Sequence, residues 1–258
     1  MLRLIRFLTF SIHIIFYLLF GGLVNLLIIP FTKPLRRKII SMLTQSWAIG
    51  MCWIFNIEIK VEGKNNIKSK ESYLIVANHL SYFDTCLIGA VIPTQFVGKR
   101  EVIKWPIFGW LSLIGGVIFI DRSKLTQGAS RAKIVADSLS EGNSVAVFPE
   151  STTSNGDKLL PFKPSFYLAV IESKKPVLPL TITFGSINGK QFKNEEKELY
   201  AWFQSETFFG HGFRMLTVRK IVMNLIIQKP IYPEEGMDAR TIMKLSQESV
   251  QSGLPSLN

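Results

Sequence analysis

One stretch near the amino terminus limits what this chain can fold into more than any other. Residues 7–31 contain no Asp, Glu, Lys or Arg. This run of about 25 residues is long enough for a helix to cross the hydrocarbon core of a bilayer, which takes about 20. We therefore expect a membrane helix. A cleaved signal peptide is the alternative, because Arg3 and Arg6 form a basic leader, but the apolar run is too long and lacks a small-residue cleavage site.

A basic block and a second apolar stretch follow this run. The block, KPLRRK at residues 33–38, would be attracted to the anionic cytoplasmic surface of a membrane. The second stretch, residues 39–59, includes Ser, Thr and Gln side chains. We expect it to form an interfacial or re-entrant helix that makes a hairpin with the first helix. Residues 1–57 are thus predicted to be membrane-associated helices.

The whole chain is basic and rich in apolar residues, with a formal net charge of +11, 47% hydrophobic residues and 19% charged residues. A positive charge of this size can serve nucleic acid, anionic lipid or an acidic substrate. Nucleic-acid binding calls for basic residues interleaved with exposed aromatic residues, or for a groove-reading helix. Here the basic residues flank apolar helices, so we expect membrane lipid as a partner and no nucleic acid.

After residue 57 the pattern changes to short apolar runs separated by longer mixed segments, which is typical of an α/β domain. Strands are predicted at residues 73–77, 94–97, 117–120, 144–148, 177–184 and 221–227. A helix is predicted at residues 126–141, closed by Gly142. Residues 58–250 are therefore assigned to one α/β domain, and residues 251–258, rich in Ser, Gly and Pro, to a disordered tail.

Residues 188–214 have a different composition, in which a charged patch is followed by several aromatic residues. Two interpretations fit this pattern. The segment could lie on the membrane, or it could be a solvated loop over an aromatic core.

The strand at residues 73–77 leads into NHLSYFD, residues 78–84, in which four residues separate His79 from Asp84. If Asp84 lies in the first turn of a helix, its carboxylate can bind one imidazole nitrogen of His79. The other nitrogen is then free to take a proton from a bound alcohol. The alternative is a helix cap in which His79 has no chemical role. Spacing alone favours the cap.

Two later strands also end in charged residues, namely Arg122 and Glu150. The carboxyl ends of parallel strands meet along one edge of a sheet, where ligands bind. Arg122 would suit an anionic group there, and Glu150 could bind hydroxyl groups or hold a cation.

With these blocks in order, the sequence resembles the glycerolipid acyltransferase family, which includes 1-acyl-sn-glycerol-3-phosphate acyltransferases. The matching blocks are NHLSYFD at residues 78–84, GGVIFIDR at 115–122, FPEST at 148–152 and PVLPL at 176–180. Residues 104–110 (KWPIFGW) and 159–163 (LLPFK) are also similar to family sequence.

The resemblance implies an α/β fold with a mostly parallel sheet flanked by helices, preceded by an amino-terminal membrane-embedded helical hairpin. It also implies acyl-CoA or acyl-carrier protein as the acyl donor, with no cofactor and no metal. The implied location is a membrane, the bacterial inner membrane, with the catalytic domain on the cytoplasmic side.

The resemblance also implies roles for individual residues. His79 would deprotonate the acceptor hydroxyl, which attacks the donor thioester, and Asp84 would stabilise the imidazolium. Arg122 and Lys99 would bind the acceptor phosphate, although a simple salt bridge at the rim of the site is the alternative for both. Glu150 would help to place the acceptor. The residues Ser151, Thr152 and Thr153 would complete the substrate-binding set.

One block departs from the family pattern, which is commonly Glu-Gly-Thr-Arg where this chain has Glu150-Ser-Thr-Thr153. A Gly that permits unusual torsions is replaced by Ser151, and a phosphate-binding Arg by Thr153. The expected acceptor is 1-acyl-sn-glycerol-3-phosphate, giving phosphatidate. The alternative acceptors are a zwitterionic lysophospholipid and a lyso-ornithine lipid.

Two other classes of protein fit the sequence less well. A non-catalytic lipid-binding membrane protein on the same fold would explain the altered block, but it would not need His79, Asp84 and Glu150 together. A serine hydrolase would need a Gly-x-Ser-x-Gly motif, which is absent from the sequence.

Overall fold

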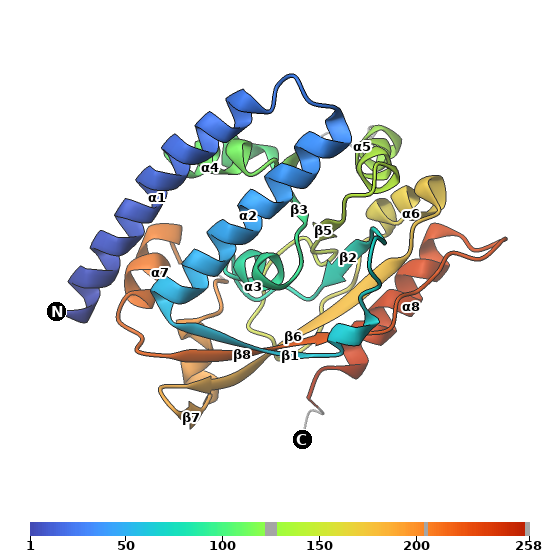
Figure 1. Ribbon diagram of the computed structural model, residues 1–258. Coiled ribbons are helices and arrows are strands. Elements are labelled where there is room, and N and C mark those ends of the chain that lie inside the picture. Colours follow the sequence, from blue (N-terminus) through green and yellow to red (C-terminus); the bar gives the residue numbers. More distant parts are fainter. Residues whose placement is uncertain (122–127, 204–205, 256–258) are drawn as a thin grey trace.

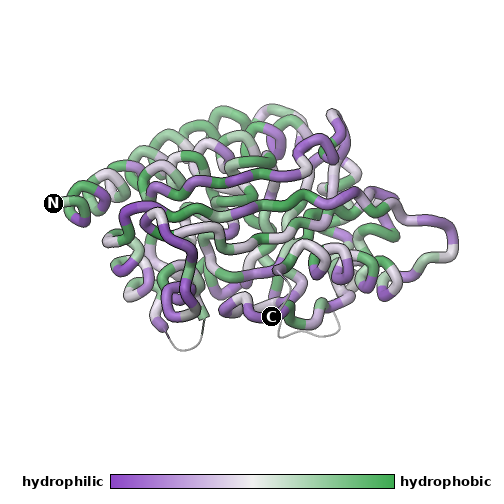
Figure 2. Tube along the Cα trace, turned by 90° about the horizontal axis from the view of Figure 1, so that it is seen from below, coloured by the Kyte–Doolittle hydropathy of each residue, from purple (hydrophilic) through white to green (hydrophobic). Residues whose placement is uncertain are grey.

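The computed structural model describes residues 1–121, 128–203 and 206–255. Two long helices, α1 (Leu2–Leu27) and α2 (Lys33–Phe55), form an antiparallel hairpin beside an α/β domain (Figure 1). Within the described ranges, α1 is the one helix long and apolar enough to cross a membrane. The apolar helix expected from the sequence is therefore present, and Figure 2 shows it as mostly hydrophobic along its length.

Helix α2 begins at Lys33, inside the basic block, and not at residue 39 as the apolar pattern suggested. The preceding Thr32 is extended, and a proline occupies the first turn, where its missing N–H costs nothing. The helix ends at Asn56, whose left-handed conformation (φ 52°) terminates it. Strand β1 (Ile57–Glu62) follows directly, so the hairpin is joined to the domain without a linker.

Helix α1 is attached to the domain at both ends. Near its start, the buried Arg6 donates hydrogen bonds to backbone carbonyls that follow α7 (Phe208–Met215), including that of Arg219 at 2.9 Å. Near its end, Asn25 Nδ2 donates to the carbonyl of Ile114 at 3.1 Å. The helix therefore lies along the domain, with most of its other side exposed and apolar.

The sheet has the strand order β1-β8-β6-β2-β5-β3-β4, with β7 paired to β6. The remaining strands are β2 (Leu74–Ala77), β3 (Gln95–Lys99), β4 (Ile118–Ile120), β5 (Val145–Val147), β6 (Val177–Ile187), β7 (Lys190–Gln191) and β8 (Ile221–Ile227). Strand β6 pairs antiparallel with β7 and β8, and the other pairs are parallel. All the strands predicted from the sequence are present, and the mostly parallel sheet is confirmed.

Helices cover both faces of the sheet. Alternate residues of the fully buried β2 face opposite layers: Ile75 and Ala77 belong to the core under α2 and α3 (Asp84–Val91), whereas Leu74 and Val76 belong to the core on the other side. That second core is formed with α5 (Gly128–Ser140), α6 (Leu168–Ser173) and α8 (Ala239–Ser252). A further helix, α4 (Phe108–Ile114), packs against α1.

Two expectations fall partly on residues that the structure does not describe. The helix expected at residues 126–141 is described from Gly128, as α5. The tail expected at residues 251–258 overlaps α8, which continues to Ser252, while residues 256–258 lie outside the described part of the chain.

Candidate active site

The loop that follows β2 is held to the neighbouring strand by Asn78. The side chain of Asn78 donates to the carbonyl of Ile182 at 2.9 Å and accepts from the N–H of Ile182 at 2.8 Å. The buried amide therefore continues the pairing between β2 and β6 by one further residue, although the backbone has begun to turn. This positions the next residue, His79, at the edge of the sheet where the parallel strands β2, β5 and β6 have their carboxyl ends.

His79 and Asp84 form a direct pair. Nδ1 of His79 lies 2.8 Å from Oδ2 of Asp84, the first residue of α3. The same oxygen accepts the N–H groups of Leu80 at 2.6 Å and Ser81 at 2.9 Å. The buried carboxylate therefore binds the imidazole and two backbone donors of the preceding loop at once. Helix α3 itself has no side-chain cap, so the contact that the structure shows is the His79–Asp84 pair and not the helix cap.

The geometry of the imidazole indicates which nitrogen carries the proton. Because Nδ1 faces a carboxylate, it carries the hydrogen, and the lone pair is left on Nε2. Nε2 makes no hydrogen bond with any described residue. The ring is stacked on Phe148 and lines a cavity. A general base needs this arrangement.

A third residue completes the surroundings of Asp84. The hydroxyl of Tyr200 donates to Oδ1 of Asp84 at 2.9 Å, and both side chains are fully buried. Tyr200 follows the 3₁₀ helix η5 (Asn194–Leu199), in the segment whose role the sequence left open. Sequence reasoning missed this contact, because nothing in the local pattern links Tyr200 to a residue so far away in the chain.

Glu150 supports the backbone of His79. Its Oε1 accepts the N–H of His79 at 2.7 Å, and its Oε2 accepts the N–H of Leu160 at 3.0 Å. Burial raises the pKa of Glu150 to about 7, against the opposing effect of these two hydrogen bonds. Since both carboxylate oxygens are occupied and the side chain does not line the cavity, contact with an acceptor remains a prediction.

The residues after Glu150 border the cavity beside His79. Ser151 has φ 65°, so the position where the family commonly has Gly does require a left-handed backbone, which Ser adopts with some strain. Ser151, Thr152 and Thr153 line the cavity, and so does Lys99 at the end of β3. Arg122, expected at the same edge, lies outside the described residues.

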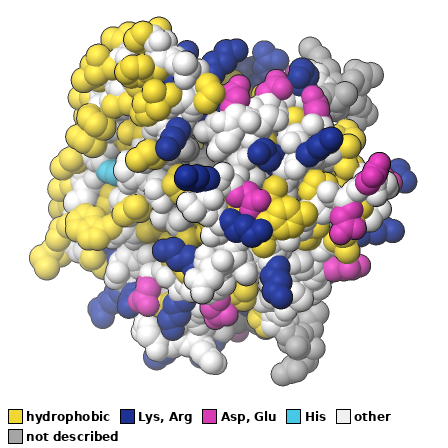
Figure 3. All heavy atoms as spheres, turned by 45° about the vertical axis from the view of Figure 1, so that its right-hand side comes forward, with side chains coloured by type: hydrophobic (Ala, Val, Ile, Leu, Met, Phe, Trp, Pro, Cys, Tyr) yellow, Lys and Arg dark blue, Asp and Glu magenta, His cyan; other side chains and the backbone are white. Residues whose placement is uncertain are grey.

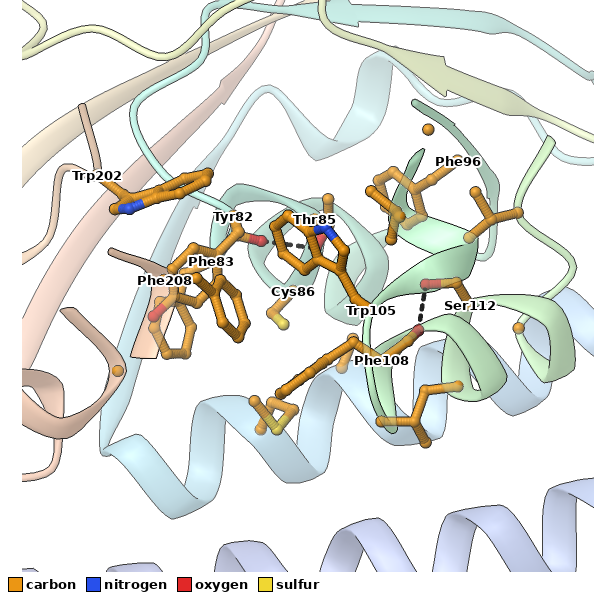
Figure 4. Close-up of a pocket in the computed structure, with 18 of the residues that line it drawn as sticks. Tyr82, Phe83, Thr85, Cys86, Phe96, Trp105, Phe108, Ser112, Trp202 and Phe208 are labelled. Carbon is orange, nitrogen blue, oxygen red and sulfur yellow. Dashed lines mark hydrogen bonds between the residues drawn. The ribbon is translucent and has the colours of Figure 1, made fainter. Parts of the chain in front are cut away.

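The cavity has a volume of about 740 Å³ and extends from His79 towards the space between α1, α2, α4 and α7. Its walls are mostly apolar and aromatic, as Figure 4 shows for Tyr82, Trp105, Phe108, Trp202 and Phe208. The size is that of a typical ligand pocket. A long hydrocarbon chain fits such a lining.

The segment at residues 188–214 forms part of this wall. Trp202 donates its backbone N–H to the carbonyl of Leu80 at 2.8 Å, which fixes the segment to the loop of His79. The ring of Phe208 packs on Tyr82 at 4.6 Å and on Phe108 at 4.7 Å between centroids. An aromatic core therefore underlies the segment, as one of the two interpretations predicted, while Phe209 and Phe213 are exposed.

The site thus pairs His79 with Asp84 at the edge of a mostly parallel sheet, and His79 lines an apolar cavity beside α1 and α2. A family model described as "Acyltransferase" matches residues 58–183. The lyso-ornithine lipid O-acyltransferase of Pseudomonas aeruginosa is 30% identical over 224 residues, which are 86% of this chain and 80% of that protein. The chain belongs to this acyltransferase family.

Two further similar proteins are named for a glycerophosphate acceptor. The 1-acyl-sn-glycerol-3-phosphate acyltransferase of Neisseria gonorrhoeae is 30% identical over 145 residues, which are 56% of this chain and 57% of that protein. The crystal structure of the 1-acyl-sn-glycerophosphate acyltransferase PlsC from Thermotoga maritima superposes with a TM-score of 0.71 at 23% identity. The match covers 98% of this chain and 94% of the PlsC chain. The chain is thus an acyltransferase of the glycerolipid or lysophospholipid type, and its expected fold is confirmed.

Proposed function

We propose that His79 is the general base of this acyltransferase and that Asp84 orients it. The observation that carries the proposal is the 2.8 Å contact between Nδ1 of His79 and Oδ2 of Asp84, at a ring that lines the cavity. Nε2 removes the proton of a lysolipid hydroxyl, and the hydroxyl oxygen attacks the carbonyl carbon of an acyl thioester. The carbon–sulfur bond breaks, and the imidazolium returns the proton to the departing thiolate, leaving an ester and a free thiol.

The donor in this proposal is acyl-CoA or acyl-carrier protein, whose acyl chain enters the apolar cavity. The cavity volume of about 740 Å³ and its aromatic lining support a long chain.

For the acceptor we propose a lyso-ornithine lipid, whose headgroup is an amino acid. Thr153 stands where the family commonly has an arginine, so one positively charged group that could bind a phosphate is missing. The relative from Pseudomonas aeruginosa is named a lyso-ornithine lipid O-acyltransferase. The second candidate is 1-acyl-sn-glycerol-3-phosphate, which the sequence placed first. Lys99 beside the cavity and the relative from Neisseria gonorrhoeae support it.

We further propose that the protein lies on the cytoplasmic side of the bacterial inner membrane, with α1 in the surface of one leaflet. Because Arg6 and Asn25 tie both ends of α1 to the domain, the helix cannot separate to span the bilayer alone. Figure 3 shows exposed hydrophobic side chains gathered along one side of the molecule. Residues such as Leu19 (71% exposed) contribute to this apolar surface.

The central experiment is mass spectrometry of products after the purified protein in micelles is given each lysolipid with each donor. His79→Ala should lower the rate of acyl transfer about 10²–10⁴-fold, because base catalysis is removed. Full activity of this variant would refute the role of His79.

The acceptor is tested by Thr153→Arg, with Gln191→Arg on the exposed β7 as a control of equal charge. An arginine at residue 153 should raise the preference for the phosphate acceptor over the lyso-ornithine lipid about tenfold or more, because it adds a charge-assisted contact. An unchanged preference would contradict the interpretation of Thr153.

A further inference from the structure

We infer that Tyr200 is a positioning residue for acyl transfer, which sets the basicity of His79 by holding the carboxylate of Asp84. The inference rests on the proposed role of His79 as general base. It concerns a residue outside the range matched by the family model, residues 58–183.

The two oxygens of Asp84 have separate partners. Oδ2 accepts from His79 Nδ1, Leu80 N and Ser81 N, all within the same loop. Oδ1 accepts from the Tyr200 hydroxyl at 2.9 Å. Without Tyr200, Oδ1 would be a buried carboxylate oxygen with no donor among the described residues, and the carboxylate would lose a bond that opposes its rotation.

Tyr200 is held in place by its own turn and by ring packing. Its backbone N–H donates to Lys197 O at 3.1 Å, within the turn of η5. Its ring packs against Phe83 of the catalytic loop, with 6.3 Å between centroids, and against Phe184, with 6.2 Å between centroids and the planes 89° apart. The hydroxyl is therefore aimed at Asp84 by packing, and the side chain itself does not line the cavity.

The phenol acts as a donor throughout the working pH range. Burial, and then the negative charge of Asp84, raise the pKa of Tyr200 well above its ordinary value. A donor on Oδ1 draws negative charge away from Oδ2, the oxygen that faces His79. Removing this donor leaves more charge on Oδ2, which stabilises the imidazolium form of His79.

Other titratable groups also face this carboxylate, and the experiment must leave them unchanged. Those near Asp84 are His79 in the same loop, Glu150 after β5 and Cys86 on α3, and Cys52 on α2 lies near Tyr200. Both thiols are buried, and burial raises their pKa. Neither thiol changes charge near neutral pH.

The test is Tyr200→Phe, assayed as kcat and kcat/KM against pH with a saturating acyl thioester. We expect kcat to fall about tenfold, the size of one hydrogen bond to a charged group. We also expect the acidic limb of kcat/KM to move up by roughly half to one pH unit, with little change in KM. A fall in kcat with an unmoved pH profile would show a purely structural role and overturn the inference.

The matched control is Tyr73→Phe. Tyr73 is also buried, and its hydroxyl also donates to a carboxylate, Glu71 Oε2 at 2.7 Å, but it makes no contact with Asp84. This variant should keep the pH profile of the unchanged protein. If it shifts the profile as Tyr200→Phe does, the effect is not specific to Asp84 and the inference fails.

A second variant covers the possibility that Tyr200→Phe does not fold. Fluorotyrosine at residue 200 keeps the shape of the ring and strengthens the donor, so the acidic limb should move to lower pH. A shift to higher pH, or none, would overturn the inference.

Failure of this inference can be distinguished from failure of the proposed function. If His79→Ala remains active, the proposed function fails. If His79→Ala is inactive while both changes at residue 200 leave the pH profile unmoved, only the role of Tyr200 fails. In an Asp84→Asn background, Tyr200→Phe should alter kcat by less than about twofold, because the two residues act through one contact.

Discussion

The imidazole of His79 lies flat against the ring of Phe148, with the centroids 3.8 Å apart and the planes 9° from parallel. The two residues follow adjacent parallel strands, β2 and β5, whose register pairs Val76 with Val147. The stack is thus a consequence of sheet register. It holds the ring in the plane in which Nδ1 reaches Asp84.

Phe148→Leu should therefore leave His79 in place but hold its imidazole ring less firmly in the plane that reaches Asp84. A stacked ring pair contributes about 0.5–1.5 kcal/mol, so kcat should fall roughly twofold to tenfold with KM nearly unchanged. Phe192→Leu is the control, because Phe192 is also paired with a ring, that of Phe184, but does not line the cavity. Equal kcat values for the two variants would mean that the stack does not orient His79.

Asp84→Asn should lower kcat about 10²–10⁴-fold, because an amide stabilises neither the required tautomer nor the imidazolium. It should also lower the free energy of unfolding by about 1–3 kcal/mol, since an amide cannot accept every N–H that the carboxylate accepts. Steady-state kinetics and thermal unfolding measure the two effects. Asp137→Asn, at an exposed ion pair with Lys133, should leave activity unchanged.

Glu150 should make stability depend on pH. Burial raises the pKa of Glu150 from the ordinary 4.5 to about 7. Between these two pH values the Glu150 carboxyl is protonated in the folded protein and ionised in the unfolded chain. The free energy of unfolding should therefore fall as pH rises from about 5 to 7.5, by up to about 3 kcal/mol.

Urea unfolding in micelles at several pH values measures this slope. Glu150→Gln should flatten it, and Glu248→Gln, at an exposed position on α8, should not. An identical slope in Glu150→Gln and the unchanged protein would assign the pH dependence to other groups.

Two helical glycines should respond in opposite ways to the same substitution. A Cβ at Gly50 would lie within 2.8 Å of His13 Nε2. The His13 ring is stacked on Trp47, with 4.5 Å between centroids, and this stacking opposes its movement away from the new methyl group. Gly50→Ala should thus push α1 away from α2 and cost about 1–3 kcal/mol.

A Cβ at Gly22 would meet no atom within 4 Å. Gly22→Ala should therefore stabilise α1 by about 0.5–1 kcal/mol through its helix propensity. Thermal unfolding of both variants in micelles measures the difference. A stable Gly50→Ala variant would show that the contact between α1 and α2 can adapt.

The features that the sequence by itself determined are those set by neighbouring residues. The charge-free run at residues 7–31 specified an apolar helix, and alternating apolar runs specified the strands. The contacts of Asp84 with His79, Leu80 and Ser81 also lie within one short loop, so the spacing of the motif was sufficient to suggest the His79–Asp84 contact, although spacing alone did not favour it over a helix cap.

Only the tertiary structure decided which distant groups meet at the site. The bond from Tyr200 to Asp84 joins residues 116 apart in sequence, and that from His79 N to Glu150 joins residues 71 apart. Tyr200 and Glu150 acquire these roles because the strands that carry their segments are brought together by sheet pairing and by the packing of the apolar layers. A local pattern records which groups a residue offers, whereas the partners of a buried group depend on which segments the whole chain brings within hydrogen-bond distance.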